Sequence, residues 1–476
     1  DTRQHATPVL GGASRPAHRR HARPVQRNGH GAARLEPTRR RTSAHGGGSA
    51  TGIDRGPRRA GRSSRRGSRR GGGGLRSSSS ESTDRDRGLA VDRTSAIGVA
   101  SDLGVARTSR SLPDHRSLHG RTPAVNPCEV SWFAALCDDD YEQLGVVDTT
   151  LRSSWDHCSR IVLTAEQHGF DNILLPSGYA LGIDSVTFAA GVARLTSQIR
   201  LLVAVRCGEM WVPQLARQLA SLDQMLDGRL TVNIISSEMP GEVLDAEPRY
   251  QRTVETMAVL RSLLDGRSTA HHGDFIDLEL APPRVTTLSG KSPLLYFGGL
   301  SEPAREAAAR EADVYLMWPD TRERIVELID DMRSRAARHG RTLRFGYRAH
   351  VVVRETESEA RHAAEHIVAA LDDATGEAIR ARSLDSQSVG VRRQAELRTG
   401  SADDGYAEPH LWTGIGRGRS GCGAAIVGDP DQVAAKIDDY RSLGIEAFIL
   451  SGYPHVDECE RFGRSVLPRI DHAPLD

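Results

Sequence analysis

The sequence predicts an α/β fold, a (β/α)8 TIM barrel with insertions, over residues 126–476. Eight short runs of apolar and β-branched residues alternate with longer runs whose apolar residues recur at helical spacing. This alternation is typical of βαβ units around a parallel sheet, and eight such units favour a closed barrel. Two connections, residues 265–293 and 372–427, are too long for tight loops, so we expect them to be insertions.

Capping and turn residues define the predicted elements in chain order. Gly169 ends the first helix, Asp184 caps the second, and Pro213 stands in the first turn of the third. The predicted strands are residues 129–136, 173–176, 200–205, 230–235, 294–297, 314–317, 345–353 and 447–450. The predicted helices are residues 155–168, 184–195, 213–226, 248–264, 303–310, 321–339, 357–371 and 456–467.

Residues 1–125 differ in composition from the rest of the chain. They contain 26 Arg, no Lys and 9 acidic residues, a net charge of +17, whereas residues 126–476 carry a net charge of −16. This Arg/Gly/Ser-rich segment has too few apolar residues to offset chain entropy, so we expect it to be disordered. One alternative is a nucleic-acid-binding arm, which the absence of interleaved aromatic residues argues against. Another is sequence translated from upstream of the true start.

The six Cys residues and the apolar runs indicate the cellular setting. No two Cys form a C-x-x-C pair, and a chain of 476 residues needs no disulfides to fold, so we expect reduced thiols and a cytoplasmic protein. No apolar run approaches the roughly 18 residues of a membrane span, and the N-terminus lacks the apolar region of a secretory signal. We therefore expect no membrane association.

The predicted strand at residues 344–353, R-F-G-Y-R-A-H-V-V-V, suggests the site. Phe345 and Tyr347 lie on one face, and Arg348 and His350 lie on the other. A buried Arg is unfavourable unless an anion neutralises it, so we expect the strand to lead into a site that binds a negative group. The alternative is an edge strand whose polar face meets water.

Barrel enzymes carry their chemistry at the C-terminal ends of the strands. The Gly298-Gly299 pair before a helix is either a cradle for a phosphate or a tight turn. Tyr453 and His455 follow the last strand and form either an acid–base pair or a stacked aromatic turn. The other candidates at these ends include Trp132, Asn233, Leu300 and Ser301.

Two motif matches lack the context that their functions need. The G-x-G-x-x-G at Gly416, Gly418 and Gly421 follows no clear strand and opens no helix, so we interpret it as a mobile loop that carries Arg417 and Arg419. The H-x-x-E-H at residues 362–366 lies within a helix of the outer ring, far from the strand ends. We expect a solvated helix face there and no metal site.

Long motifs in the chain resemble those of the bacterial luciferase-like, two-component flavin-dependent monooxygenases, and among them the alkanesulfonate monooxygenases. The motifs are L-Y-F-G-G from Leu295, F-G-Y-R-A-H-V-V-V-R-E-T from Phe345, L-W-T-G-I-G-R-G-R-S-G-C-G-A-A-I-V-G-D from Leu411, and F-I-L-S-G-Y-P-H from Phe448. The resemblance covers residues 129–470. It implies a luciferase-like barrel domain over residues 126–476.

The resemblance implies an enzyme that uses reduced FMN and O2 through a C4a-peroxyflavin, and that converts an organosulfonate to an aldehyde and sulfite. It implies an NAD(P)H-dependent flavin reductase as partner, a small anionic substrate, no nucleic acid, and a homo-oligomer, either a dimer or a tetramer. The catalytic residues would be Arg348, His350, Arg419, Tyr453 and His455, with Arg417 as an alternative to Arg419. The cofactor-binding residues would be Trp132, Asn233, Tyr250, Gly298, Gly299, Leu300 and Ser301.

The sequence departs from the family pattern at two positions. The active-site Cys of the family falls near Leu181, where none of the six Cys lies, and a His is replaced by Ala246. The pocket wall therefore differs, which leaves two alternative functions open. One is a biosynthetic monooxygenase that oxidises another small molecule, and the other is a non-catalytic flavin-binding barrel.

Overall fold

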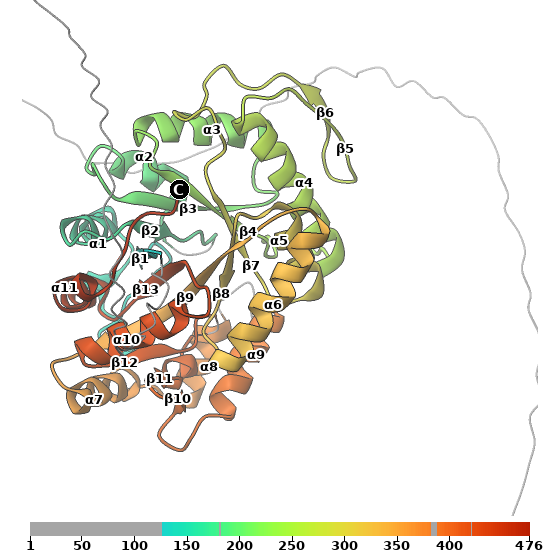
Figure 1. Ribbon diagram of the computed structural model, residues 1–476. Helices are drawn as coiled ribbons and strands as arrows, with labels where there is room; N and C mark the ends of the chain where they lie inside the picture. The colour runs from blue at the N-terminus through green and yellow to red at the C-terminus, as the bar shows by residue number, and fades with distance from the viewer. Residues whose placement is uncertain (1–125, 180–181, 382–387, 420) are drawn as a thin grey trace, which may run out of the picture. The chain divides into compact units, whose positions relative to one another are not determined.

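Eight parallel strands form a closed barrel, as the sequence predicts (Figure 1). The computed structural model describes residues 126–476 except 180–181, 382–387 and 420, so the predicted disordered segment lies outside the described residues. Parallel pairing of β8 with β9, and of β13 with β1, closes the ring. The barrel strands are β1 (Glu129–Phe133), β2 (Asn172–Leu175), β3 (Arg200–Arg206), β4 (Leu230–Ile235), β7 (Leu295–Gly298), β8 (Val314–Met317), β9 (Arg344–Val353) and β13 (Ala447–Ser451).

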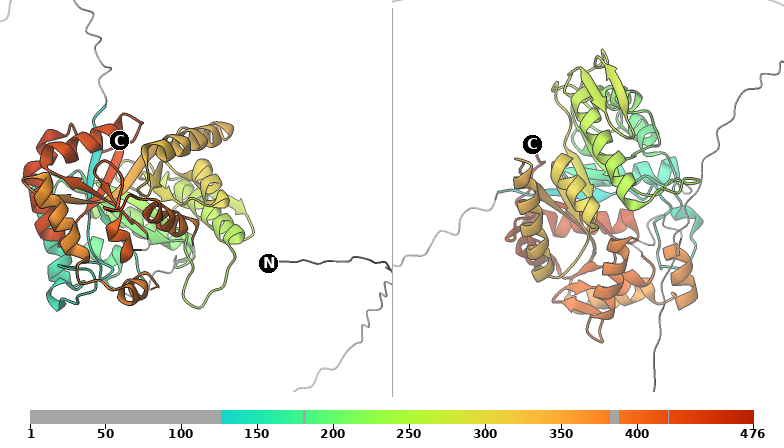
Figure 2. Two further views of the ribbon diagram at one scale, coloured as in Figure 1. Left: turned by 90° about the horizontal axis from the view of Figure 1, so that it is seen from below. Right: turned by 90° about the vertical axis from the view of Figure 1, so that its right-hand side faces the viewer.

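Helices surround the strands and cover the outer face of the barrel (Figures 1 and 2). The predicted caps are present: Asp184 accepts a hydrogen bond from the backbone N–H of Thr187 at 2.7 Å, and Pro213 lies in the first turn of α3. The helices of the ring are α1 (Trp155–Gln167), α2 (Ser185–Val192), α3 (Val212–Met225), α4 (Ala246–Leu264), α5 (Glu302–Glu311), α6 (Arg322–Arg338), α7 (Glu357–Val368), α10 (Pro430–Arg441) and α11 (His455–Ser465).

Both long connections contain secondary structure that the sequence did not predict. The first holds an antiparallel hairpin, β5 (Thr269–His272) and β6 (Asp277–Leu280), which projects from the helix ring in Figures 1 and 2. The second holds α8 (Asp373–Ala381), α9 (Val389–Thr399), β10 (Tyr406–Glu408), β11 (Leu411–Trp412), the 3-10 helix η2 (Gly414–Arg417) and β12 (Ala425–Gly428).

Strand β9 is longer than its neighbours, and this length positions the second insertion. In its first half, β9 pairs with β8 as far as Tyr347 and with β13 as far as His350. Its last residues pair in parallel with β12, with Ala425 opposite His350. The insertion therefore adds a strand, followed by α10, at the C-terminal end of β9. The sequence prediction of a single βα unit in this region was wrong, because the four-residue run A-I-V-G was taken as part of a loop.

The faces of β9 alternate as predicted. Tyr347 points outward and stacks on Tyr440 of α10, with ring centroids 4.4 Å apart. Arg348 and His350 point the other way, toward Phe133 of β1 and Ser451 of β13. The strand is almost wholly buried, so the alternative of an edge strand facing water is excluded.

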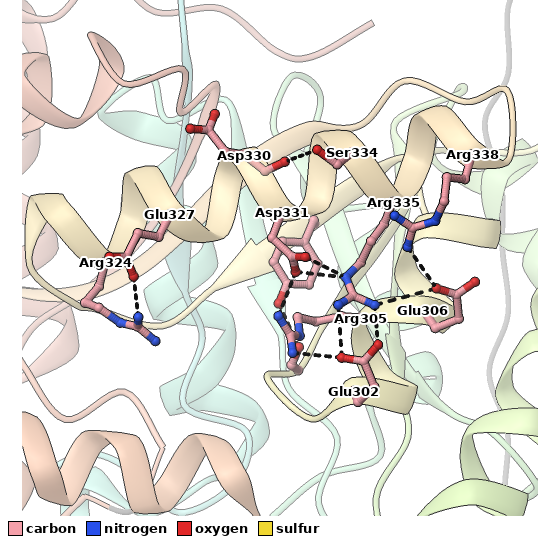
Figure 3. Close-up of polar contacts among 12 residues, drawn as sticks. Glu302, Arg305, Glu306, Arg324, Glu327, Asp330, Asp331, Ser334, Arg335 and Arg338 are labelled. Atoms are coloured by element: carbon pink, nitrogen blue, oxygen red, sulfur yellow. Dashed lines mark hydrogen bonds and ion pairs between the residues drawn. The ribbon is translucent and has the colours of Figure 1, made fainter.

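Ion pairs link neighbouring helices of the ring, as the α5–α6 pair illustrates (Figure 3). Arg335 of α6 contacts Glu302 of α5 at 2.9 Å and Asp331 of its own helix at 2.8 Å. Arg305 of α5 reaches the same Asp331 at 2.7 Å.

Within the described part of the chain, no helix combines the length and apolar character that a membrane crossing requires.

Candidate active site

Six of the seven predicted cofactor-binding residues line one cavity of about 190 Å³. The cavity lies at the C-terminal ends of β4, β7 and β8, where barrel enzymes bind their ligands. One residue comes from β4, one from α4, one from the end of β7, and three from the turn between β7 and α5. These residues are Asn233, Tyr250, Gly298, Gly299, Leu300 and Ser301.

One end of this cavity has the features of an anion site. Gly299 has φ +144°, and a Cβ atom there would lie 2.7 Å from the Cβ of Ala304. Glycine therefore keeps the turn open and brings the N-terminus of α5 to the cavity, where backbone N–H groups favour an anion. Arg249 lines the same cavity, and its Nε atom is buried without a hydrogen-bond partner in the described structure. These groups fit a phosphate such as that of FMN.

The second insertion supplies part of the cavity wall. Val389 and Gly390 of α9 line the cavity beside Trp318, and a Cβ atom on Gly390 would lie 2.7 Å from the Trp318 ring. Two hydrogen bonds from Arg393 to Asp320, of 2.7 and 2.8 Å, fix α9 against the end of β8. The sequence did not predict this helix or its contribution to the cavity.

Trp132 lies outside the cavity, although it was predicted with the cofactor-binding residues. Alternation along β1 turns Phe133 into the barrel and Trp132 outward. The Trp132 ring packs in the core against Phe170, at 5.4 Å between centroids, and Phe462, at 6.1 Å. The prediction considered the end of the strand without assigning its faces, and the structure gives Trp132 a packing position instead.

The five predicted catalytic residues form a second group over β1, β9 and β13. Arg348 is the cation at its centre: it is 4% exposed, and its guanidinium lies 4.6 Å from the centre of the Phe133 ring. Its Nη1 donates to the carbonyl of Ala349 at 2.7 Å, but it forms no ion pair with any described residue. Burial lowers the pKa of Arg348. A buried guanidinium without a counter-ion favours an incoming anion.

His350 lies two residues further along β9, on the same face. Its Nδ1 is 2.9 Å from the Oγ of Ser451, whereas its Nε2 is buried without a partner in the described structure. Burial, and then the nearby Arg348, holds the pKa of His350 well below its ordinary value. The imidazole is therefore neutral at pH 7, with one ring nitrogen unused by the protein.

Tyr453 and His455 complete the predicted group. The rings of His350 and Tyr453 lie 5.2 Å apart, and those of Tyr453 and His455 lie 5.4 Å apart. The Nε2 of His455 lies 3.0 Å from the backbone carbonyl of Asp139. A carbonyl only accepts, so Nε2 carries the proton and Nδ1 holds a free lone pair. This Nδ1 is buried and has no described partner, and burial lowers the pKa of His455.

Asp139 is the residue of this group that sequence reasoning missed. It follows β1, is 3% exposed, and accepts a hydrogen bond of 2.7 Å from the Tyr453 hydroxyl. Burial, and also Asp139, raises the pKa of Tyr453 well above its ordinary value, so its hydroxyl remains a proton donor. Three consecutive Asp residues a few positions after a barrel strand, Asp138 to Asp140, were the signal that could have identified it.

Arg419 reaches the group from the second insertion. Its Nη2 lies 2.6 Å from the Oδ2 of Asp139. Burial disfavours the Arg419 cation, but the nearby acidic groups, Asp139 first among them, together outweigh this effect and raise the pKa of Arg419. Arg417, the alternative from the sequence, donates instead to the carbonyl of Leu371 at 2.6 Å. The geometry therefore brings Arg419 into the group and leaves Arg417 outside it.

The two motif matches lie in structural contexts other than those their patterns require. Gly416, Gly418 and Gly421 surround Arg419 and precede strand β12 rather than a helix. His362 and His366 lie on α7, and the described residues contain no group of three His, Cys, Asp or Glu arranged to hold a metal. Leu181, near which the family Cys falls, lies outside the described residues.

The arrangement has two functional parts. The cavity lined by β4, β7 and β8 can hold a phosphate-bearing ligand, and none of the five predicted catalytic residues lines it. The second group offers two guanidinium groups, two neutral imidazoles and a protonated phenol. Such a set binds a small anion and moves protons near it.

Comparisons with known proteins show the family of the chain. The family described as luciferase-like monooxygenase matches residues 130–447. A sulfoquinovose monooxygenase from Novosphingobium aromaticivorans is 59% identical over 360 residues, which cover 74% of this chain and 99% of the relative. A sulfoquinovose monooxygenase from Agrobacterium fabrum is 52% identical over 354 residues, which cover 74% and 92%.

A solved structure supports the fold. The EDTA monooxygenase from Chelativorans sp. BNC1 superposes with a TM-score of 0.59 at 16% identity, covering 72% of this chain and 93% of that protein. At this identity the likeness concerns the barrel and its insertions alone.

Proposed function

The chain belongs to the luciferase-like monooxygenase family and is a flavin-dependent monooxygenase, and we propose that it cleaves the carbon–sulfur bond of a sulfonated sugar. The substrate class follows from two relatives that are named sulfoquinovose monooxygenase and match this chain over nearly their whole length. The reaction uses reduced FMN and O2 and yields an aldehyde and sulfite.

The observation that carries the sulfonate assignment is the buried Arg348 without a counter-ion. A sulfonate is a compact anion with three equivalent oxygens, and a guanidinium binds two of them with parallel hydrogen bonds. Because Arg348 is held against Phe133 and the carbonyl of Ala349, its position is set before the substrate arrives. The other part of the sugar lies toward the cavity lined by β4, β7 and β8.

The residues of that cavity would hold FMN. The N-terminus of α5, Ser301 and Arg249 would bind its phosphate, and Tyr250 and Asn233 would contact the rest of the cofactor. The reduced flavin supplies the two electrons that activate O2. The wall of α9, with Gly390 packed on Trp318, excludes water from this side of the site.

The chain's own residues bind the anion and handle protons. Arg348 and Arg419 hold the sulfonate, and the free Nδ1 of His455 accepts the proton that leaves the carbon bearing sulfur. Tyr453 stabilises the developing oxyanion as a hydrogen-bond donor, since it stays protonated. Overall, R–CH2–SO3⁻, O2 and FMNH2 yield R–CHO, SO3²⁻, H⁺, FMN and H2O, which balances atoms and charge.

Further partners follow from this chemistry. A separate NAD(P)H-dependent flavin reductase supplies the reduced FMN.

Exposed aromatic side chains at Trp155, Tyr179 and Trp211 support a homo-oligomer, either a dimer or a tetramer. Light scattering of the purified chain would test this oligomeric state. All six Cys are unpaired, which supports a cytoplasmic setting.

The test is sulfite release by the purified full chain with FMN, NADH, O2 and a flavin reductase. Sulfoquinovose, octanesulfonate and glucose are compared, with glucose as the control that lacks sulfur. We expect sulfite at a stoichiometry near one per O2 consumed with sulfoquinovose, and a lower kcat/KM with octanesulfonate. The absence of sulfite from both sulfonates contradicts the proposal. O2 consumption with another product would then indicate a biosynthetic monooxygenase, and FMN binding without O2 consumption would indicate a flavin-binding barrel.

A further inference from the structure

Asp139 contacts three of the five residues of the proposed anion site. Its Oδ1 accepts the hydroxyl of Tyr453 at 2.7 Å, its Oδ2 pairs with Arg419 at 2.6 Å, and its backbone carbonyl accepts from His455 at 3.0 Å. These partners come from two separate parts of the chain, because Tyr453 and His455 follow β13 and Arg419 belongs to the second insertion. We propose that Asp139 is the positioning residue that orients Tyr453, Arg419 and His455 for the reaction, an inference that rests on the proposed function.

The neighbouring Asp140 has a structural role, which distinguishes it from Asp139. Its Oδ2 contacts His157 of α1 at 2.8 Å, and its Oδ1 accepts from the backbone N–H groups of Tyr141 and His455. Asp140 therefore fixes the backbone where α11 begins. Asp139 differs because both of its carboxylate oxygens hold side chains that face the substrate.

The ion pair is one of the contacts that hold the segment of residues 414–419, beside the hydrogen bonds from Arg417 to Leu371 and from Arg398 to Gly416. This segment contains η2 and ends at Arg419, whose charged end reaches Asp139. The carboxylate is almost fully buried, so the pair is weakly screened by solvent and removal of the charge leaves Arg419 without its partner. We therefore expect the segment to open more often when Asp139 is neutral.

The proton on Tyr453 depends on the same carboxylate. The charged and titratable groups facing Tyr453 are Asp139 and Tyr141 after β1, Arg419 before β12, His350 on β9 and His455 on α11. Asp139 disfavours the phenolate and Arg419 favours it. Burial still favours the protonated phenol without the Asp139 charge, but Tyr453 loses its proton at a lower pH than in the wild type.

The experiment compares the wild-type full chain with Asp139→Asn, which keeps the shape and removes the charge. Asp138→Asn is the matched control, because Asp138 lies in the same loop and, within the described part of the chain, forms its hydrogen bonds with Ser153 and the Tyr141 hydroxyl. Hydrogen exchange of residues 414–419 is measured on the chain without ligands. We expect exchange about 10-fold faster in Asp139→Asn, the factor that corresponds to loss of one hydrogen bond to a charged group. Asp138→Asn should exchange like the wild type.

The second readout is the pH profile of kcat for sulfite release. We expect the high-pH limb of Asp139→Asn to move down by about one unit, as for the loss of one neighbouring charge. The inference is overturned if Asp139→Asn has the same exchange rates and the same pH profile as the wild type. The proposed function stays intact in that case as long as the wild type releases sulfite. If the wild type releases no sulfite, the proposed function fails, and the exchange result still decides whether Asp139 holds the segment. Should Asp139→Asn not fold, Asp139→Glu must change both readouts, and unchanged values overturn the inference.

Discussion

Replacing Arg348 by Met should lower activity while leaving the fold at least as stable. The substitution keeps an unbranched apolar stem and removes the guanidinium with its charge. At about 4 Å and an effective dielectric constant of about 20, a guanidinium and a sulfonate attract each other by about 4 kcal/mol. Because Arg348 is 4% exposed and has no competing ion pair among the described residues, most of this attraction is available to the substrate.

This energy corresponds to a kcat/KM about 10³-fold lower for sulfite release, at about 1.4 kcal/mol per factor of ten. Stability should move in the opposite direction. A buried charge without a counter-ion is unfavourable, so the free energy of unfolding is expected to be unchanged or higher by about 0–4 kcal/mol. Urea unfolding followed by circular dichroism measures it.

The matched control is Arg344→Met. Arg344 begins the same strand, three residues before Tyr347, and lies toward the opposite end of the barrel from the site. It should leave kcat/KM unchanged. An Arg348→Met variant with wild-type kcat/KM, or one whose loss of activity is matched by a loss of stability, would refute the assignment of Arg348 as the anion-binding group.

Three further predictions concern the cofactor cavity, the helix ring and the C-terminus. Gly299→Ala should weaken FMN binding by about 10-fold or more, as measured by fluorescence quenching. The reason is that φ +144° strains any side chain and the new Cβ meets Ala304. An affinity equal to that of the wild type would contradict the role of Gly299 in phosphate binding. Arg335→Met should lower the free energy of unfolding by about 1–2 kcal/mol, since it breaks the ion pairs of Arg335 with both Glu302 and Asp331 rather than one surface pair. An unchanged free energy in urea unfolding would show that these ion pairs do not stabilise the fold. A hydrogen bond to Asp171 raises the pKa of His472 above its ordinary value, so its contribution to stability is fully present below about pH 6.5 and is lost as pH rises through the folded-state pKa. The difference in unfolding free energy between wild type and His472→Gln should therefore shrink between pH 5.5 and 8.5, and a difference that grows with pH would contradict this sign.

The sequence was sufficient for the barrel because each barrel strand carries its own local signal. Strands β4 and β8 were predicted with the bounds that the structure shows, and the alternation of β9 correctly placed Arg348 and His350 on one face. Strand β12 was missed because four residues after a Gly-rich run give no periodicity. Its strand character depends on the free edge of β9, which is a tertiary feature.

The site could be predicted only in part, for a similar reason. Residues at strand ends were found from topology, but their faces were not, which is why Trp132 was grouped with the cofactor residues. Asp139 was missed because its role depends on a partner 314 positions later in the chain and on another brought in by the second insertion. No local pattern encodes such contacts.

Because α9 forms part of the cavity wall, the residues that bind the anion and those that shape the cavity wall lie in different parts of the chain. The eight βα units carry the anion-binding strand and the glycine turn, whereas Val389 and Gly390 belong to a helix outside those units. Exchanging this helix between relatives could thus retune which molecules the enzyme accepts, with the barrel left untouched. Chimeras joined on either side of α9 offer a direct route to enzymes for other sulfonated compounds.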